Sequence, residues 1–493
     1  MPAPSLPGLR MIGPLVGFLV LVEITSGILQ GYYTPLLTDI ARHLGIDDGD
    51  VNWFESAQLM LSALAVPILA KLGDIYGHKR ILLVSTVLTA AASWGVAFAP
   101  DFWTFLAAWS LQGFYVVWLP MEIALIFSRV RHAPNRAVLT RKAAGLLVGA
   151  LELGVIGGAL LGGVLVEHFP LWFTLCLPAA AVTLCIFAVH FGVPESTALD
   201  GGTVDRTGFV LLAAGLLLLT SGLTFLRING PGTWWVWAVL AAGVASFIPF
   251  VRYELGQKDP LVDFRMLRSP SMWPVQLTAG LFGISVLGAQ APMSTFARTD
   301  PGLHGYGLGL AASQVSIIIG TYVLALLVGA LLFPLAARRT TPRNTLVGAS
   351  LLVGVGYGLF LPFHDTLPQA LMNMVVAGLG SGALVAALPS AAAAAAPLNR
   401  TGMATGLTNT TKTIGGSFAS AVFGIALAGA AADALAGGAA DAGTVAPLQG
   451  YLTVWAVCSV TAFIAAAVLL LVPRLAFADP PLAAAAASEE AAA

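Results

Sequence analysis

Long apolar runs recur from one end of the chain to the other, and they constrain its fold more than any other feature. Fourteen runs are long enough to cross about 30 Å of hydrocarbon as helices. Only 10% of the 493 residues are charged, whereas a soluble chain is about a quarter charged. We therefore predict an all-α polytopic membrane protein. The runs span 11–33, 54–72, 80–99, 102–128, 143–166, 170–193, 207–227, 234–254, 273–296, 312–337, 344–363, 367–392, 403–431 and 449–473.

Basic residues predict how these spans are oriented. Arg42, Arg227 and Arg298 fall in loops on one side of the membrane, and Lys412 lies within a span. The other nineteen of the 23 Lys and Arg residues fall on the opposite side. Because positively charged loops stay in the cytoplasm, we expect a multi-pass protein of the cell membrane with both termini cytoplasmic.

The spans group as six, two and six, which predicts two six-helix bundles joined by an inserted hairpin. The loops are too short for a catalytic domain, so we do not expect an enzyme. No phosphate-binding loop of the form G-x-x-x-x-G-K-[ST] occurs, and the net charge of −1 gives no hint of nucleic acid. The expected segments are an N-terminal bundle at 1–195, a linker with two extra spans and an amphipathic stretch at 196–271, a C-terminal bundle at 272–474 and a disordered tail at 475–493.

Carboxylates inside the spans are the sharpest functional signal. Glu23, Glu122 and Glu152 each lie well within an apolar run, where an unpaired charge costs roughly 3 kcal/mol on insertion scales. The last six spans contain no Asp or Glu at comparable depth. Protonatable groups are therefore expected only in the N-terminal bundle.

Polar residues form stripes on three spans. At 100° per residue, Glu23, Gln30 and Thr34 share one face of the first span, and such a face must meet another helix or water. One interpretation is a shared cavity that binds a bulky, partly apolar substrate; the alternative is hydrogen bonding between helices, worth roughly 1 kcal/mol or less per contact. The expected cavity-lining residues are Gln30, Thr34, Gln112, Tyr115, Trp118 and Gln290.

Carboxyl groups in such a cavity suggest a coupling mechanism. Burial favours the protonated, neutral form of a carboxyl group, whereas a cationic substrate favours the ionised form. Proton and cation then compete for one site, which is the physical basis of antiport. Glu23, Glu122 and Glu152 are the candidate proton or substrate groups, and no cofactor besides the proton gradient is expected.

The loop between the second and third spans carries a recognisable motif. It reads AKLGDIYGHKRIL at 70–82, and it resembles the cytoplasmic loop motif of the major facilitator superfamily. The match rests on Asp74, Gly77, Lys79 and Arg80. The resemblance implies the major facilitator fold and a role for these four residues in locking one conformation.

The glycines of the fifth span resemble the antiporter pattern of the same superfamily, G-x8-G-x3-G-P-x2-G-G, with Ala159 in place of the proline. Small residues at this spacing let two helices approach closely, so we expect this span to pack against the other bundle. GLTNTTKTIGGS at 406–417 resembles a further motif, with Asn409 and Lys412 as its polar residues. The matching glycines are Gly145, Gly154, Gly158, Gly162 and Gly163.

These resemblances imply a fourteen-span drug:proton antiporter of a bacterial cell membrane, working as a monomer in contact with lipid. It would export amphipathic, possibly cationic, small molecules by alternating access. Trp109 stands where the family has an arginine, and this departure and Ala159 keep an importer or facilitator on the same fold as an alternative. A membrane receptor or scaffold that does not transport is the alternative of another class.

Overall fold

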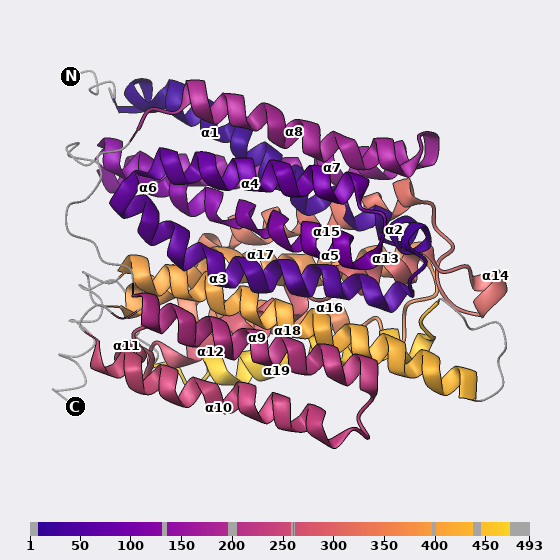
Figure 1. The fold of residues 1–493 in the computed structure, drawn as a ribbon. Coiled ribbons are helices and arrows are strands. Elements are labelled where there is room, and N and C mark those ends of the chain that lie inside the picture. Colours follow the sequence, from indigo (N-terminus) through magenta and orange to yellow (C-terminus); the bar gives the residue numbers. More distant parts are fainter. Residues whose placement is uncertain are drawn as a thin grey trace.

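The computed structural model describes residues 8–130, 136–195, 205–257, 260, 262–396, 401–436 and 445–473, and within them every regular element is a helix. The long helices lie roughly side by side (Figure 1). Helix α1 begins and α19 ends at the same end of the molecule, which we call the terminal end; the opposite end is the far end. The predicted tail at 475–493 lies outside the described residues.

Six spans of the N-terminal half form one bundle with its own buried core. The first span bends after Gly31 and continues through a short turn into α2, and the fourth span is interrupted at Gly113. The elements are α1 (Gly8–Gly31), η1 (Thr34–Leu36), α2 (Leu37–Leu44), η2 (Asp48–Val51), α3 (Asn52–Tyr76), α4 (His78–Phe98), α5 (Phe102–Gln112), η3 (Gly113–Val117), α6 (Trp118–Val130), α7 (Arg136–His168) and α8 (Leu171–Gly192).

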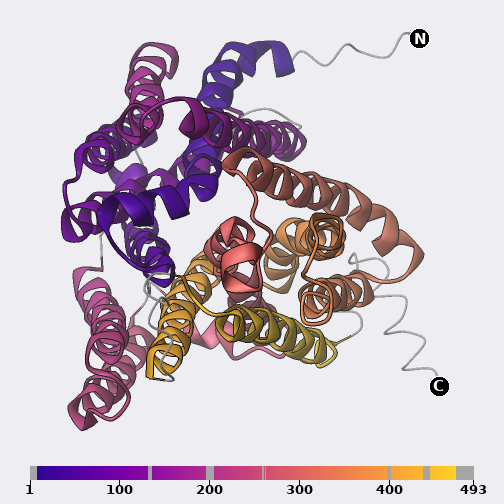
Figure 2. The same ribbon diagram turned by 90° about the vertical axis from the view of Figure 1, so that its right-hand side faces the viewer.

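The C-terminal half forms a second bundle around a separate core. A hairpin of two helices precedes it and lies on the flank, beside α3 and α18 (Figure 2). The hairpin is α9 (Arg206–Asn229) and α10 (Trp234–Gly256); the bundle contains α11 (Phe264–Leu267), α12 (Trp273–Val286), α13 (Gln290–Arg298), α14 (Pro301–His304), α15 (Ala312–Arg339), α16 (Pro342–Gly358), α17 (Leu367–Ala395), α18 (Thr401–Ala436) and α19 (Leu448–Leu469).

Thirteen of the described helical segments are long and apolar enough to cross a membrane. The predicted span at 344–363 corresponds to α16, which has 17 residues and packs between α17 and α19. At 1.5 Å per residue, α16 covers about 25 Å, somewhat less than the hydrocarbon core. The count of fourteen spans therefore stays a prediction.

The same helix crossing occurs in both bundles. In the N-terminal bundle α1 packs on α7, and in the C-terminal bundle α12 packs on α18. Glycines allow both crossings: a Cβ on Gly27 would meet the backbone of Leu151, and one on Gly283 would meet the backbone of Lys412. The bundles then meet through α7 with α15 and through α18 with α3. This repetition places α7 and α18 in equivalent positions at the interface between the bundles.

Candidate functional site

The interrupted fourth span positions polar side chains inside the N-terminal bundle. Gly113 lies where the helix changes, and a Cβ there would meet the Gln58 carbonyl and the Ser62 hydroxyl. Ser62 Oγ lies 2.7 Å from the Gln58 carbonyl oxygen of its own helix and 2.9 Å from the Gly113 carbonyl oxygen, so its one hydroxyl proton is shared between α3 and the interruption. The interruption therefore separates α5, which ends at Gln112, from α6, which begins at Trp118.

Gln112 is fully buried just before this interruption. Its Nε2 donates to the Tyr33 hydroxyl and to Ser93 Oγ, both at 3.0 Å. These bonds connect α5 to α1 and α4. Gln112, predicted to line the cavity, is thus held by partners within its own bundle. Trp118, predicted to line it as well, is fully buried, and its ring packs against that of Tyr115.

Glu23 of α1 and Glu122 of α6 come together in the interior. Both side chains are 0% exposed, and the two carboxyl groups are close enough to interact with each other. Among the described residues, none of their four oxygens has a hydrogen bond of standard geometry. Two carboxyl groups from different helices thus face each other in the interior of the N-terminal bundle.

A third carboxyl group, from Glu55 of α3, belongs to the same neighbourhood. The buried Tyr115 hydroxyl lies within electrostatic range of both Glu55 and Glu23. The sequence reading gave Glu55 no role because it lies near the start of its span. The tertiary structure instead places it beside a predicted cavity residue, where it is only partly exposed.

Glu152 occupies a different position, facing the other bundle. It is 8% exposed, and Lys412 of α18 lies within electrostatic range of it. Tyr322 of α15 is also in range, and its buried hydroxyl has no hydrogen bond of standard geometry to any described residue. Three helices from two bundles thus bring two opposite charges and a phenol together.

Three of the predicted site residues have exposed side chains and belong to neither buried group of charges. Gln30, Gln290 and Asn409 are exposed side chains. Gln290 Nε2 donates to the carbonyl of Val286 in its own span, at 3.0 Å. Helical spacing predicts the face of a span on which a residue lies, but it does not indicate what lies opposite that face.

The glycines of α7 correct one expectation. A Cβ on Gly154, Gly158 or Gly162 would meet the backbone of α1, which belongs to the same bundle. Only Gly163 meets the other bundle, at Ala312 and Ser316 of α15, and Gly145 has nothing within 4 Å. Most of the motif therefore serves packing within a bundle, because α1 crosses α7 at the level of these glycines.

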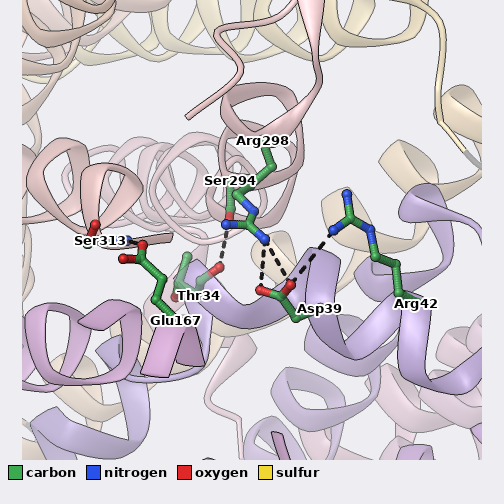
Figure 3. A network of polar contacts seen from close by, with 7 residues as sticks. All are labelled: Thr34, Asp39, Arg42, Glu167, Ser294, Arg298 and Ser313. Carbon is green, nitrogen blue, oxygen red and sulfur yellow. Dashed lines mark hydrogen bonds and ion pairs between the residues drawn. The ribbon is translucent and has the colours of Figure 1, made fainter. Parts of the chain in front are cut away.

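Polar contacts join the two bundles at the far end (Figure 3). Arg298 Nη2 of α13 lies 2.8 and 3.0 Å from the two carboxylate oxygens of Asp39 in α2. Ser294 Oγ donates to the Thr34 carbonyl at 2.5 Å. The sequence predicted Thr34 on the polar face of the first span but gave no signal for the Asp39–Arg298 ion pair, since 259 residues separate its members.

Helix α7 adds two further contacts to this closure. The Ser313 backbone N–H donates to Glu167 Oε1 at 2.8 Å, and Ser316 Oγ donates to the Ala159 carbonyl at 2.7 Å. We call the contacts of Asp39, Thr34 and Glu167 with the C-terminal bundle the far-end latch. Among the described residues, the cross-bundle hydrogen bonds lie in the far half or near mid-span, and the terminal end has none.

The loop motif at the terminal end makes its contacts within the N-terminal bundle. Gly77 has φ +100°, a conformation that favours glycine. The Lys79 backbone N–H donates to Glu195 Oε1 at 3.1 Å, and Arg80 Nε lies 3.7 Å from Glu195 Oε2. Asp74 lies 3.3 Å from His78 Nε2. The motif therefore holds the α3–α4 turn against the end of α8.

Comparison with known proteins identifies the family of this chain. The family model described as Major Facilitator Superfamily matches residues 19–420. The chain belongs to the major facilitator superfamily. Members of this superfamily are membrane transporters and not enzymes.

Several superfamily relatives are named as exporters. The chain is 27% identical over 402 residues to the cephamycin export protein CmcT of Amycolatopsis lactamdurans, covering 79% of each chain. It is 26% identical over 425 residues to the puromycin resistance protein pur8 of Streptomyces alboniger, covering 84% of this chain and 82% of the relative.

Solved structures support the fold. A nucleoside transporter, NupG, superposes with a TM-score of 0.62 at 13% identity, covering 94% of this chain and 99% of that one. A peptide transporter, POT, gives 0.66 at 14% identity, covering 92% and 93%. At this identity the likeness shows the superfamily fold alone.

Proposed function

We propose that this superfamily member is a secondary active exporter, which exchanges an amphipathic small molecule bearing a cationic group for protons. The observation that carries the proposal is the Glu23–Glu122 pair. Two buried carboxyl groups from different helices share one neighbourhood and have no other hydrogen-bond partner among the described residues. Such a pair can take up a proton when reached from one side of the membrane and release it to the other.

Alternating access supplies the second half of the mechanism. The far-end latch closes one end, and the terminal end has no cross-bundle hydrogen bond among the described residues. In transporters of this fold the two bundles rock about a midplane site. Proton binding at the pair changes the charge of the N-terminal bundle, and this change biases which end is closed. The names of the relatives CmcT and pur8 support export as the direction.

Transport into sealed vesicles tests the proposal. We expect everted vesicles that contain the protein to accumulate dansylcadaverine, a fluorescent amphipathic amine, when their interior is acidic. Glu23→Gln and Glu122→Gln should each abolish this accumulation, because neither variant can cycle a proton at the pair. Asp365→Asn, at a carboxylate whose side chain is 75% exposed, is the matched control and should transport normally.

Two outcomes would contradict the proposal. One is accumulation that does not depend on the pH gradient; the other is full proton-driven transport by the Glu23→Gln, Glu122→Gln double variant. A proton-coupled importer is the second candidate, favoured by the unbroken helix α7, which has Ala159 where the antiporter pattern has proline. Reversing the pH gradient distinguishes the two, because an importer carries the amine in the direction of the proton.

A further inference from the structure

Two opposite charges face each other across the interface between the bundles. Helix α7 packs on α15 with a regular register: Ser316 Oγ donates to the Ala159 carbonyl at 2.7 Å, and a Cβ on Gly320 would lie 3.8 Å from Ile156. One further turn along this antiparallel contact places Glu152 beside Tyr322. Glu152 therefore points from the N-terminal bundle toward the C-terminal bundle.

Lys412 approaches from the equivalent helix of the other bundle. Its backbone carbonyl lies against Gly283 of α12, and its side chain is partly exposed. Among the described residues its ammonium group has no hydrogen bond and no carboxylate within 4.0 Å, and Glu152 is the acidic group in electrostatic range. The two charges thus lie in electrostatic range of each other without a direct ion pair.

Tyr322 adds a buried hydroxyl group to this pair of charges. The tyrosine is 8% exposed, and its hydroxyl lies near those of Ser381 and Tyr357 of the same bundle. Glu152 of the other bundle lies within electrostatic range of this hydroxyl. The three side chains therefore form a polar cluster at the interface between the bundles.

We propose that Glu152, Lys412 and Tyr322 bind the polar head of a zwitterionic amphiphile, with its ammonium group at Glu152 and its carboxylate at Lys412. This inference names the substrate class of the exporter, and so it rests on the proposed function. A ligand that carries both charges pairs both residues at once. A ligand that carries only the ammonium leaves Lys412 unpaired beside it, and like charges in a desolvated site repel. Because Glu152 and Lys412 lie on different bundles, the zwitterion also draws the bundles together.

Three dansyl compounds with the same apolar body test this proposal. Nε-dansyl-lysine is a zwitterion, dansylcadaverine carries the ammonium alone, and dansylglycine carries the carboxylate alone. Their binding to the purified full-length protein in lipid nanodiscs is followed by the rise in dansyl fluorescence. We expect the zwitterion to bind at least tenfold more tightly than either singly charged compound.

Two variants identify the residues. Lys412→Gln should weaken binding of dansyl-lysine and dansylglycine about tenfold and strengthen binding of dansylcadaverine. Retained amine binding proves that this variant is folded. Glu152→Gln should weaken dansyl-lysine and dansylcadaverine and spare dansylglycine, and Lys412→Arg should keep the parent order. Arg338→Gln, an exposed charge at the end of α15, is the control and should change nothing.

Equal affinities for the three compounds would overturn the inference, as would tightest binding of dansylcadaverine or no effect of Lys412→Gln on dansyl-lysine. These measurements are made at equilibrium without a pH gradient. Failure of the proton-driven vesicle assay therefore leaves them intact, and their failure leaves proton-driven export of the amine intact.

Discussion

Helix α7 has two faces lined by small residues, and the two faces pack against helices of different bundles. One face, with Gly154, Gly158 and Gly162, packs against the backbone of α1 in its own bundle. The other face, with Ala159 and Gly163, packs against α15 of the opposite bundle. In alternating access the first contact persists in every state, whereas the second must form and break. Close packing therefore contributes to the stability of the N-terminal bundle on the α1 face. On the α15 face it contributes to the balance between the open and closed states of the far end.

The largest effect is expected on the α1 face. Gly158→Val would drive side-chain atoms into the Ile28 backbone, since even a Cβ would lie 2.9 Å from its Cα. Overpacking of this kind costs about 1–3 kcal/mol or more, and we expect a lower unfolding temperature and less protein in the membrane. The neighbouring Gly157 has nothing within 4 Å, so Gly157→Val is the matched control. Equal unfolding temperatures for the two variants would contradict the assignment of this face.

A smaller and different effect is expected on the α15 face. A Cβ on Gly163 would meet Ser316 and Ala312 of the other bundle, so Gly163→Ala should disfavour the state in which the far end is closed. Spin labels at Phe169 and Leu303, both exposed, report the distance between the bundles at this end. We expect longer distances in the variant, with an unfolding temperature close to that of the parent. A large loss of stability with unchanged distances would show that this contact is permanent.

The smallest effect is expected at the far-end latch. Arg298 and Asp39 are 12% and 23% exposed, and such an ion pair contributes about 1 kcal/mol, or about a fivefold change in the population of the closed far end. Arg298→Gln should open the far end by this factor in the same spin-label measurement. The swap Asp39→Arg with Arg298→Asp should restore the parent population. Lack of restoration would show that the two residues act separately.

The sequence predicted the membrane helices well. Apolar runs of about 20 residues have few alternatives to membrane helices, because the hydrocarbon core leaves no other way to pair the backbone. It also singled out Glu23 and Glu122 as carboxyl groups within the spans, and both are fully buried. Their role as proton or substrate groups of a cavity stays a prediction. Their pairing could not be predicted, because periodicity gives the face of a helix and not the helix that covers it.

The same limit explains the other differences. The α7 glycines were expected to contact the opposite bundle, and three of them contact α1, because the spacing of small residues signals close approach to any helix. Neither Glu55 nor Tyr322 is marked by a motif in the sequence. In the structure Glu55 lies near Tyr115, and Tyr322 lies near Glu152 of the other bundle. The Asp39–Arg298 pair depends on how the two bundles meet at the far end.

The sequence by itself determined that this chain spans a membrane as helices, carries the acidic residues that lie deep in its spans in the first bundle, and belongs with the major facilitator transporters. These features follow from local hydropathy and from short motifs, which are written in neighbouring residues. Only the tertiary structure decided which charges meet: Glu23 with Glu122 inside one bundle, and Glu152 with Lys412 across two. Electrostatic interactions act over a few ångströms of space, and the residues that share this space are separated by up to hundreds of positions in the chain.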